Sequence, residues 1–393
     1  MTDISSQFPI RSTQSVYFDA AATAQKPRAV IDSIQDILEN KYASIQRGVY
    51  QSSQDLTQRY ENVRDIVREF CQVPDMYHVV CTHGTTESFN MLQQILPLPK
   101  NPATKNVILL SELEHHANSV GWIEFAKENG YTIRYLPLKD YAIDEDALPE
   151  YLTADVAVVS ISHMSNVFGS MCDVQQICEC ARRVNAISII DGAQSISHTP
   201  ISIHDMQPDF FLFSGHKVGG LTGCGVLIGK KKILEESSVY QKGGQMIQSV
   251  THNSVSYAPL PQRLEAGTTP FVEFISLGEA LTFMKQNAKE IYENQSSVFT
   301  YLLDRLKSYE DIQLFLSKNQ KGILSFVHQK LSHYDIAMFL AEQNICVRAG
   351  HHCCMPLMEY LHIPGTVRIS IGMHNTKEDV DALCAALDKI RLL

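Results

Sequence analysis

The sequence predicts an α/β protein built on a mainly parallel sheet, followed by a smaller α+β unit. Seven short apolar runs between residues 79 and 229 alternate with segments of helical periodicity. Most of these runs are continuous in Val, Ile, Leu and Phe, which is typical of strands buried on both faces. After residue 268 the pattern changes to a long helical stretch, two further strands and a closing helix.

The strands of the large sheet are predicted first along the chain. They cover residues 79–81, 106–110, 133–136, 156–161, 186–190, 210–213 and 225–228. Helical periodicity fills several of the gaps, for example 174–184 and 87–95, where Glu87 lies in the favoured first turn. This order of elements predicts a seven-stranded sheet flanked by helices.

The second unit is predicted to contain a long helical stretch over 274–307, strands over 322–327 and 367–372, and a helix over 377–391. We place the large domain at residues 16–262 and the small domain at 263–393, completed by residues 1–15. No repeat, low-complexity tract or Gly/Ser linker separates them, so we expect tight packing and a site at their interface.

Composition excludes several classes of protein. The chain of 393 residues is long enough for a buried core, and its 33 basic against 43 acidic residues give a net charge of −10. A broad basic surface for nucleic acid or acidic lipid is therefore not indicated. The apolar runs are far shorter than the ~20 residues of a membrane helix, and residues 1–11 show no secretory signal. We expect a cytoplasmic protein whose ten cysteines are reduced.

Polar residues that could carry chemistry follow the predicted strands directly. Asp191 ends one strand, and Ser214, His216 and Lys217 follow another. Residues 82–86, Thr-His-Gly-Thr-Thr, lead from a strand into a helix, whose free N–H groups favour an anion such as phosphate. Ligands of parallel sheets bind at these carboxyl ends of the strands, so we expect one shared site.

An Asp and a Lys beside an anion cradle are the groups that pyridoxal phosphate requires. The Lys forms a Schiff base, and the Asp keeps the pyridine nitrogen protonated so that the ring withdraws electrons. Each residue alone is a weak signal, because a Lys after a strand is usually solvated or salt-bridged and an Asp there is often a helix N-cap. The joint order Gly-Thr-Thr, Asp-x-x-Gln and Ser-x-His-Lys favours the cofactor.

The run His351-His352-Cys353-Cys354 has an alternative interpretation as a metal site, since both residue types bind zinc. Four consecutive residues cannot readily direct four side chains at one tetrahedral centre, so we predict no metal. Cys178 and Cys180 lie two apart in a predicted helix and point away from each other. We interpret them as small helix residues.

Four stretches carry a family resemblance, within a similarity that runs from residues 18–27 to residues 365–370. The four stretches are Glu114-His115-His116-Ala117-Asn118, Asp191-Gly192-Ala193-Gln194, Ser214-Gly215-His216-Lys217 and Arg348-Ala349-Gly350-His351-His352-Cys353. On these residues the chain resembles the SufS-type (group II) cysteine desulfurases and selenocysteine lyases, of the class V aminotransferase branch of fold-type I pyridoxal phosphate enzymes.

The resemblance implies a role for each residue around the cofactor. Lys217 would hold pyridoxal 5'-phosphate as a Schiff base, and Asp191 would pair with its pyridine nitrogen. His115 would stack on the ring, and Gln194 would bond the phenolic oxygen. The phosphate would be held by Thr86, Ser214 and His216, with Thr268 from the other chain of a homodimer.

The resemblance also implies the substrate and the reaction. Arg368 would bind the carboxylate of L-cysteine with a two-pronged donor, and Asn166 and Arg348 would line the pocket. The amine of Lys217 would remove the α-proton, and Cys353 would take the sulfur as a persulfide, leaving L-alanine. A free Cys has a pKa of ~8.5, so activation by His351, His352 or Arg348 is expected.

The expected function is to supply sulfur for iron–sulfur cluster assembly, with L-selenocysteine as a further substrate. Two alternatives stay open: a pyridoxal-binding scaffold without turnover, and an aminotransferase or β-lyase without a cysteine nucleophile. The intact Lys217, Asp191, Cys353 and Arg368 argue against the scaffold, and the Cys353 loop argues against the second alternative.

The sequence departs from the family pattern at several positions. Cys354 stands where the family usually has Ala, and it is either an inert small residue or a second sulfur acceptor. His83 and Tyr50 also differ, which affects loop shape and access to the site. Tyr334 stands where relatives that pass sulfur to a zinc-bound scaffold carry His, so we predict a SufE-like acceptor protein.

Overall fold

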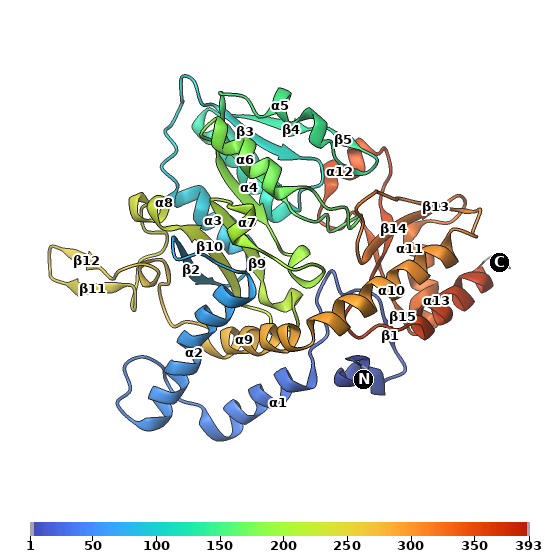
Figure 1. Ribbon diagram of the computed structural model, residues 1–393, viewed down its shortest axis with the longest axis horizontal. Coiled ribbons are helices and arrows are strands. Elements are labelled where there is room, and N and C mark those ends of the chain that lie inside the picture. Colours follow the sequence, from blue (N-terminus) through green and yellow to red (C-terminus); the bar gives the residue numbers. More distant parts are fainter. Residues whose placement is uncertain (1–3, 391–393) are drawn as a thin grey trace.

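A computed structural model describes residues 4–390 and contains, within that range, a seven-stranded and a four-stranded sheet (Figure 1). The large sheet has the order β2-β10-β9-β8-β7-β3-β4. Its strands are β2 (Tyr77–Thr82), β3 (Val107–Ser111), β4 (Thr132–Leu136), β7 (Val156–Ser162), β8 (Ile187–Asp191), β9 (Phe210–Ser214) and β10 (Gly225–Lys230). Each predicted strand is therefore present, displaced by two residues or fewer at either end.

The large sheet is mainly parallel, as predicted. Neighbouring strands are parallel from β9 through β8, β7 and β3 to β4. Only β10 runs in the opposite direction, because it is antiparallel to both β2 and β9. The carboxyl ends of the parallel strands therefore share one edge, which includes Asp191 and Ser214.

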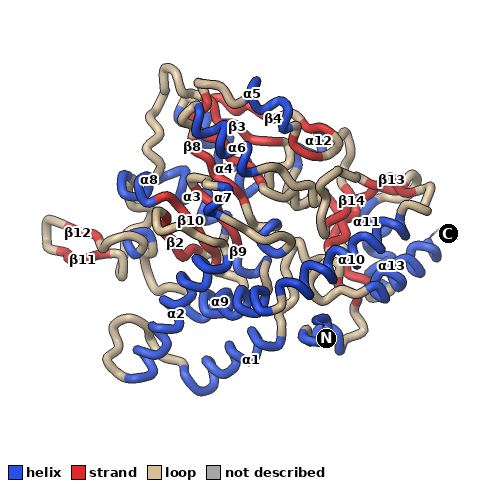
Figure 2. Tube along the Cα trace, viewed as in Figure 1, coloured by secondary structure: helices blue, strands red, loops and turns tan. Residues whose placement is uncertain are grey.

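Helices cover both faces of the large sheet (Figure 2). On one face α3 (Thr85–Ile95) and α4 (His116–Asn129) join a core that contains Phe89 and Trp122. On the other face α2 (Gln51–Phe70), α6 (Val174–Arg183) and α9 (Phe271–Gln286) join a second core. Strands β3, β7 and β9 are buried along their whole length, which explains their continuous apolar sequences.

The small unit contains an antiparallel sheet of order β13-β14-β17-β16. Its strands are β13 (Ile312–Leu314), β14 (Ile323–His328), β16 (Arg348–Gly350) and β17 (Thr366–Ser370). Helices α10 (Ala288–Leu306), α11 (His333–Glu342) and α13 (Lys377–Ile390) pack against it around a separate core. The predicted closing helix is present to residue 390, and residue 391 lies outside the described residues.

The helical stretch predicted over 274–307 is present as two helices rather than one, because the chain breaks at Asn287 into α9 and α10. Asn287 has φ −115° and ψ 21°, and its side chain donates to the Phe283 carbonyl at 2.8 Å. Asn side chains compete with helical hydrogen bonds in this way. Helix α9 belongs to the core under the large sheet, whereas α10 begins at that core with Ile291 and continues into the core of the small unit. The domain boundaries at 262 and 263 stay a prediction.

The remaining elements are short or peripheral. The helices are α1 (Arg28–Asp36), α5 (Leu148–Tyr151), α7 (Ile203–Met206), α8 (Lys231–Glu236) and α12 (Met355–Tyr360). The strands are β1 (Val16–Tyr17), β5 (Leu138–Lys139), β6 (Ala142–Ile143), β11 (Ile247–Val250), β12 (Val255–Tyr257) and β15 (Ile345–Cys346). Within residues 4–390, no helix has the length and apolar character needed to traverse a bilayer.

An N-terminal crossing segment, residues 16–24, connects the two units. Strand β1 pairs in parallel with β15, and Asp19 forms a single bridge with Ser370 beside β17. Five residues later, the Ala24 N–H donates to the His216 carbonyl beneath the large sheet at 2.9 Å. This segment therefore passes between the two sheets, where the predicted site lies.

Candidate active site

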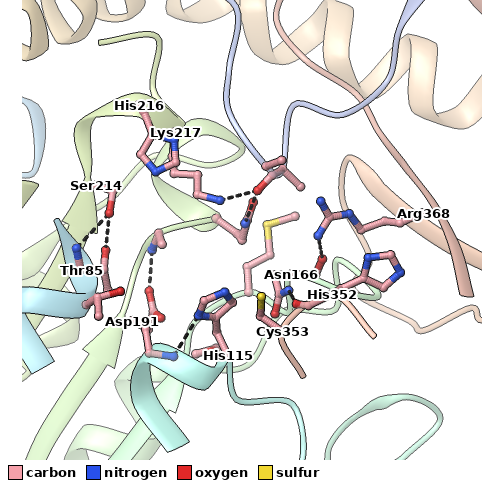
Figure 3. Close-up of a pocket in the computed structure, with 18 of the residues that line it drawn as sticks. Thr85, His115, Asn166, Asp191, Ser214, His216, Lys217, His352, Cys353 and Arg368 are labelled. Carbon is pink, nitrogen blue, oxygen red and sulfur yellow. Dashed lines mark hydrogen bonds between the residues drawn. The ribbon is translucent and has the colours of Figure 1, made fainter. Parts of the chain in front are cut away.

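A cavity of about 300 Å³ opens at the carboxyl ends of the large-sheet strands, closed on its far side by the small unit. Its size lies at the lower end of the range of small-molecule sites. Eleven of the twelve predicted site residues line it (Figure 3): Thr86, His115, Asn166, Asp191, Gln194, Ser214, His216, Lys217, Arg348, Cys353 and Arg368. The structure therefore brings these residues together, while their individual roles stay predictions.

Thr268 does not line this cavity. It is exposed on the surface, after the buried ion pair of Glu265 with Arg64 at 2.7 Å. The sequence assigns Thr268 to the site of a second chain, so a position on the surface agrees with that assignment without testing it.

Asp191 and Lys217 face the same cavity from neighbouring strands (Figure 3). The Asp191 carboxylate accepts from the Ala193 N–H at 2.8 Å, and burial raises its pKa to about 6. The Lys217 amine donates to the Ala21 carbonyl. Burial, and then the charge of Arg368, lower the pKa of Lys217 to about 8. A substantial fraction of this amine is therefore neutral near pH 8, which is the form that can act as a base.

The beginning of α3 provides the predicted anion cradle. Gly84 precedes the helix with φ +147°, a conformation that favours glycine, and lets the chain turn close to Ser214. The Ser214 hydroxyl accepts from the Thr85 N–H at 2.9 Å and bonds the Thr85 hydroxyl at 2.8 Å. The buried Nδ1 of His216 has no hydrogen-bond partner among the described residues. Thr85, which the sequence analysis did not select, thus lies beside Thr86 in the cradle.

His115 caps the first turn of α4 with its ring. Its Nδ1 accepts from the Ala117 N–H at 3.0 Å, so the neutral ring carries its proton on Nε2. Burial, and then the charge of Lys217, lower the pKa of His115 to about 4. The ring is therefore neutral at pH 7 and is held at a fixed angle over the cavity.

The loop that carries Cys353 is held over the cavity by hydrogen bonds. The Cys353 carbonyl accepts from the His116 N–H at 2.7 Å, and the His352 carbonyl accepts from the Asn166 side chain at 2.7 Å. His352 and Cys353 both have left-handed backbones, with φ 53° and 55°. Two consecutive non-glycine residues in this region are strained, typically by ~1–3 kcal/mol each. The exposed Cys353 thiol is thereby directed toward the cavity.

The neighbouring thiol points elsewhere. Cys354 is fully buried, its Sγ contacts the Glu112 carbonyl at 3.4 Å, and burial raises its pKa. His352 is also buried, and burial lowers its pKa to about 2, so it is neutral near pH 7. His351 is exposed, and its Nδ1 accepts from the Cys353 N–H at 3.1 Å. Of the three predicted activating groups, His352 therefore cannot supply positive charge.

Cys353 and Cys354 thus face different surroundings, and the four-residue run does not converge on one point. Within residues 4–390, no group of three or more His, Cys, Asp or Glu side chains is arranged to hold a metal ion.

Asp19 is a site residue that sequence reasoning missed. Its carboxylate accepts from Arg368 Nη2 at 3.1 Å and from Arg348 Nη2 at 2.8 Å. Arg368 Nη1 donates to the Asn166 carbonyl at 2.8 Å. No periodicity or motif spacing relates position 19 to positions 348 and 368, so only the folded chain reveals this contact.

Glu114 is a second carboxyl group without a predicted role. It is fully buried beside α4 and accepts from Ser111 at 2.6 Å, from Ser162 at 2.8 Å and from Asn118 at 2.8 Å. Burial raises its pKa to about 7, although these hydrogen bonds lower it. The network ties the beginning of α4, and with it His115, to the ends of β3 and β7.

We expect the wild-type protein to become less stable as the pH rises, because Glu114 must then release its proton. In Glu114→Gln this decrease in stability should be absent. An unfolded Glu titrates near ~4.3, so between that pH and about 7 the folded protein holds a proton that the unfolded chain has released. The free energy of unfolding then falls with rising pH, by about 4 kcal/mol over this window at ~1.36 kcal/mol per pKa unit. Urea unfolding at pH 4.5 and 8 measures it.

The exposed Glu310→Gln serves as the control and should keep the wild-type pH dependence. If Glu114→Gln and the wild type lose equal stability between the two pH values, Glu114 does not titrate in this window.

The residues around the cavity fit pyridoxal phosphate, the cofactor predicted from the sequence. Burial disfavours the charged form of the Asp191 carboxylate, and a protonated pyridine nitrogen beside it would stabilise that charge. The beginning of α3 and the unpartnered His216 nitrogen suit a phosphate. The Lys217 amine lies in the same cavity. The donor set, the charge and the position of the amine thus agree with one ligand.

Comparison with known proteins extends over almost the whole chain. Residues 16–383 match the model of the aminotransferase class-V family. A probable cysteine desulfurase of Halalkalibacterium halodurans is 36% identical over 384 residues, which cover 97% of this chain and 94% of that protein.

Solved structures agree with the sequence relatives. The cysteine desulfurase CsdA of Escherichia coli has a TM-score of 0.91 at 35% identity, covering 99% of this chain and 98% of that one. A cysteine desulfurase of Thermococcus onnurineus has a TM-score of 0.93 at 26% identity, covering 99% and 97%. The predicted fold class, that of fold-type I pyridoxal phosphate enzymes, is confirmed.

Proposed function

The chain belongs to the aminotransferase class-V family, and from this premise we propose that it is a cysteine desulfurase that uses pyridoxal 5'-phosphate. It converts L-cysteine to L-alanine and retains the sulfur as a persulfide on Cys353. The observation that carries the proposal is the presence of Cys353, Lys217 and Asp191 in one cavity. A transaminase would need the amine and the carboxylate but not the thiol.

Each residue around the cofactor has one task in this proposal. Bound pyridoxal phosphate withdraws electrons from the α-carbon of the substrate. Lys217 attaches the cofactor, Asp191 pairs with its ring nitrogen, and Gln194 bonds its phenolic oxygen. His115 lies on the ring face. The phosphate is held by Thr85, Thr86, Ser214 and His216, with Thr268 from the second chain of a homodimer.

Lys217 and Arg368 act on the substrate before sulfur transfer. Arg368, held by Asn166 and Asp19, binds the substrate carboxylate and orients the α-carbon. The Lys217 amine, whose pKa is lowered to about 8, takes the α-proton on Nζ. The cavity is largely buried, so water is restricted around this proton.

Sulfur transfer exchanges one bond for another. The Cys353 thiolate attacks the substrate sulfur, forming an S–S bond as the substrate Cβ–S bond breaks. The electron pair of the broken bond stays on the carbon side, which takes up protons to become L-alanine. The balance is L-cysteine plus enzyme thiol giving L-alanine plus enzyme persulfide, so no external oxidant is required.

The test combines spectroscopy with product analysis on purified protein. Reconstitution with pyridoxal phosphate should give a visible absorption band, and L-cysteine should give one L-alanine per persulfide formed before a reductant is added. Pyruvate and free sulfide without alanine would indicate a β-lyase and contradict the proposal. L-Selenocysteine in parallel tests the proposed second substrate, because its cleavage depends less on an attacking thiolate.

The proposed physiological role is to deliver sulfur to a SufE-like acceptor for iron–sulfur cluster assembly in the cytoplasm. Support comes from Tyr334 on α11, which is 58% exposed and lies next to the Cys353 loop. A Cβ added to Gly350 would be 3.2 Å from its hydroxyl. A phenol is a poor zinc ligand compared with imidazole, which argues against a zinc-bound acceptor. Stimulation by a zinc-bound acceptor, and not by a SufE-like one, would contradict this assignment.

We expect Arg368→Lys to raise the KM for L-cysteine by roughly 10–100-fold, with a smaller effect on kcat. A lysine carries all its donors on one nitrogen and lacks the planar fork that lets Arg368 reach Asn166 and Asp19 through separate nitrogens while it binds a carboxylate. Steady-state kinetics measures the split between the two constants. Arg134→Lys, at an ion pair with Asp155 away from the cavity, is the control. A wild-type KM in Arg368→Lys would refute carboxylate binding by Arg368.

A further inference from the structure

One carboxylate, that of Asp19, joins the two arginines of the cavity. Arg368 on β17 reaches it through Nη2 at 3.1 Å. Arg348 on β16 reaches it through Nε at 3.1 Å and Nη2 at 2.8 Å, a two-pronged contact. The contact spans 329 residues of sequence. An acidic residue of the crossing segment is thus the common partner of both cations.

The position of Asp19 relative to the cavity indicates what it does. Both arginines line the cavity, whereas Asp19 is not among the lining residues. The Asp19 and Arg368 side chains are 15% and 3% exposed, whereas Arg348 is 47% exposed. Asp19 therefore holds the guanidinium groups from outside the cavity. Arg368 also donates through Nη1 to the Asn166 carbonyl, and its buried Nε has no hydrogen-bond partner among the described residues, so this N–H remains available to a ligand.

Arg348 lies in the same cavity wall as Cys353. Hydrogen bonding to Asp19 is the main cause that raises the pKa of Arg348, and a negative charge on Cys353 contributes in the same direction. Arg348 thus bonds Asp19 and lines the same cavity as Cys353.

We propose that Asp19 is a positioning residue that aligns Arg368 for the substrate carboxylate and Arg348 for the Cys353 thiolate. The inference rests on the proposed function, because it assumes that a carboxylate ligand and the thiol meet in this cavity. It adds a residue that contacts neither substrate nor cofactor. This residue holds both the arginine that binds the substrate carboxylate and the arginine that serves the Cys353 thiolate.

Removing the Asp19 charge has two opposing effects. Loss of a negative charge makes the surroundings more positive, which favours an anionic ligand. Arg348, however, is half-exposed and held by Asp19, so without that partner its guanidinium can turn into solvent and take its own charge away. These two changes in charge roughly cancel. The loss of alignment remains, and we expect weaker binding.

The experiment compares two ligands of the holoenzyme that differ only in the carboxylate. L-Alanine carries it and ethylamine does not, and the visible absorbance of the bound cofactor reports the binding of either one. In Asp19→Asn we expect the Kd of L-alanine to rise roughly tenfold while that of ethylamine stays unchanged. We also expect slower alkylation of Cys353 by iodoacetamide at pH 7, measured by mass spectrometry, because the thiolate is the reactive form.

The matched control is Asp155→Asn, which removes the carboxylate partner of Arg134 away from the cavity and should change neither readout. Asp19→Glu keeps the charge and should restore most of the L-alanine affinity. If Asp19→Asn does not load cofactor, Asp19→Ser is measured in its place.

Three kinds of result count against the proposal. An L-alanine Kd that is unchanged or lower shows that Asp19 does not align Arg368, and equal weakening of both ligands indicates a general structural role. Unchanged alkylation refutes the Arg348 part. If the wild type itself takes up no cofactor or ignores both ligands, the proposed function fails instead, and the two failures are therefore distinguishable.

Discussion

Lys217→Arg is expected to abolish covalent attachment of the cofactor and to reduce turnover by roughly 10³-fold or more. Arginine keeps the positive charge, but its guanidinium neither condenses with an aldehyde nor acts as a base near pH 8. Two measurements check this: the mass of the protein after borohydride reduction with the cofactor bound, and the rate of L-alanine formation.

Lys230→Arg is the matched control. Lys230 lies at the end of β10, forms a buried ion pair with Asp209 at 2.8 Å and does not line the cavity. It should retain both the adduct and turnover. A reduced adduct in Lys217→Arg at wild-type yield would show that another amine holds the cofactor.

Cys353→Ala is expected to lose desulfurase turnover by roughly 10²-fold or more, while the protein still binds pyridoxal phosphate and L-cysteine. The thiol that accepts the sulfur is absent, but the residues around the cofactor are unchanged. L-Alanine formation, persulfide labelling and the spectral response to L-cysteine separate these steps.

Cys354→Ala tests the neighbouring thiol. Since Cys354 is fully buried in the hydrophobic core and its sulfur hydrogen-bonds a backbone carbonyl, we expect near-normal turnover and a loss of about 1 kcal/mol of stability. If Cys353→Ala keeps turnover and Cys354→Ala loses it, Cys354 is the sulfur acceptor and the assignment is wrong.

Much of the large sheet could be predicted because buried parallel strands have a direct sequence signature. Runs such as residues 156–161 cannot face water on either side, so burial dictates their composition. The break at Asn287 was missed because one polar residue hardly disturbs an apolar period that continues on both sides. Its effect depends on a local hydrogen bond to the Phe283 carbonyl, which competes with the helix.

The site could be predicted where chemistry limits the choice of residue, as at Lys217, Asp191 and Cys353. Asp19 and Glu114 could not, because each acts through contacts that join distant parts of the chain. Glu114 lies in a stretch that the resemblance did single out, yet its significance comes from burial and from hydrogen bonds with β3 and β7. Burial of an individual carboxyl group is a property of the fold that sequence patterns do not encode.

The crossing segment also determines when the site can form during synthesis on the ribosome. Residues 16–24 emerge first, but their partners on β15, β17 and the His216 turn are translated much later, up to 352 residues downstream for Ser370 on β17. Contacts so distant in sequence are slow to form and leave early segments exposed to aggregation. A nascent chain arrested before β17 would thus already contain every strand of the large sheet, which ends at residue 230, while its pocket would still lack the wall that carries Arg368.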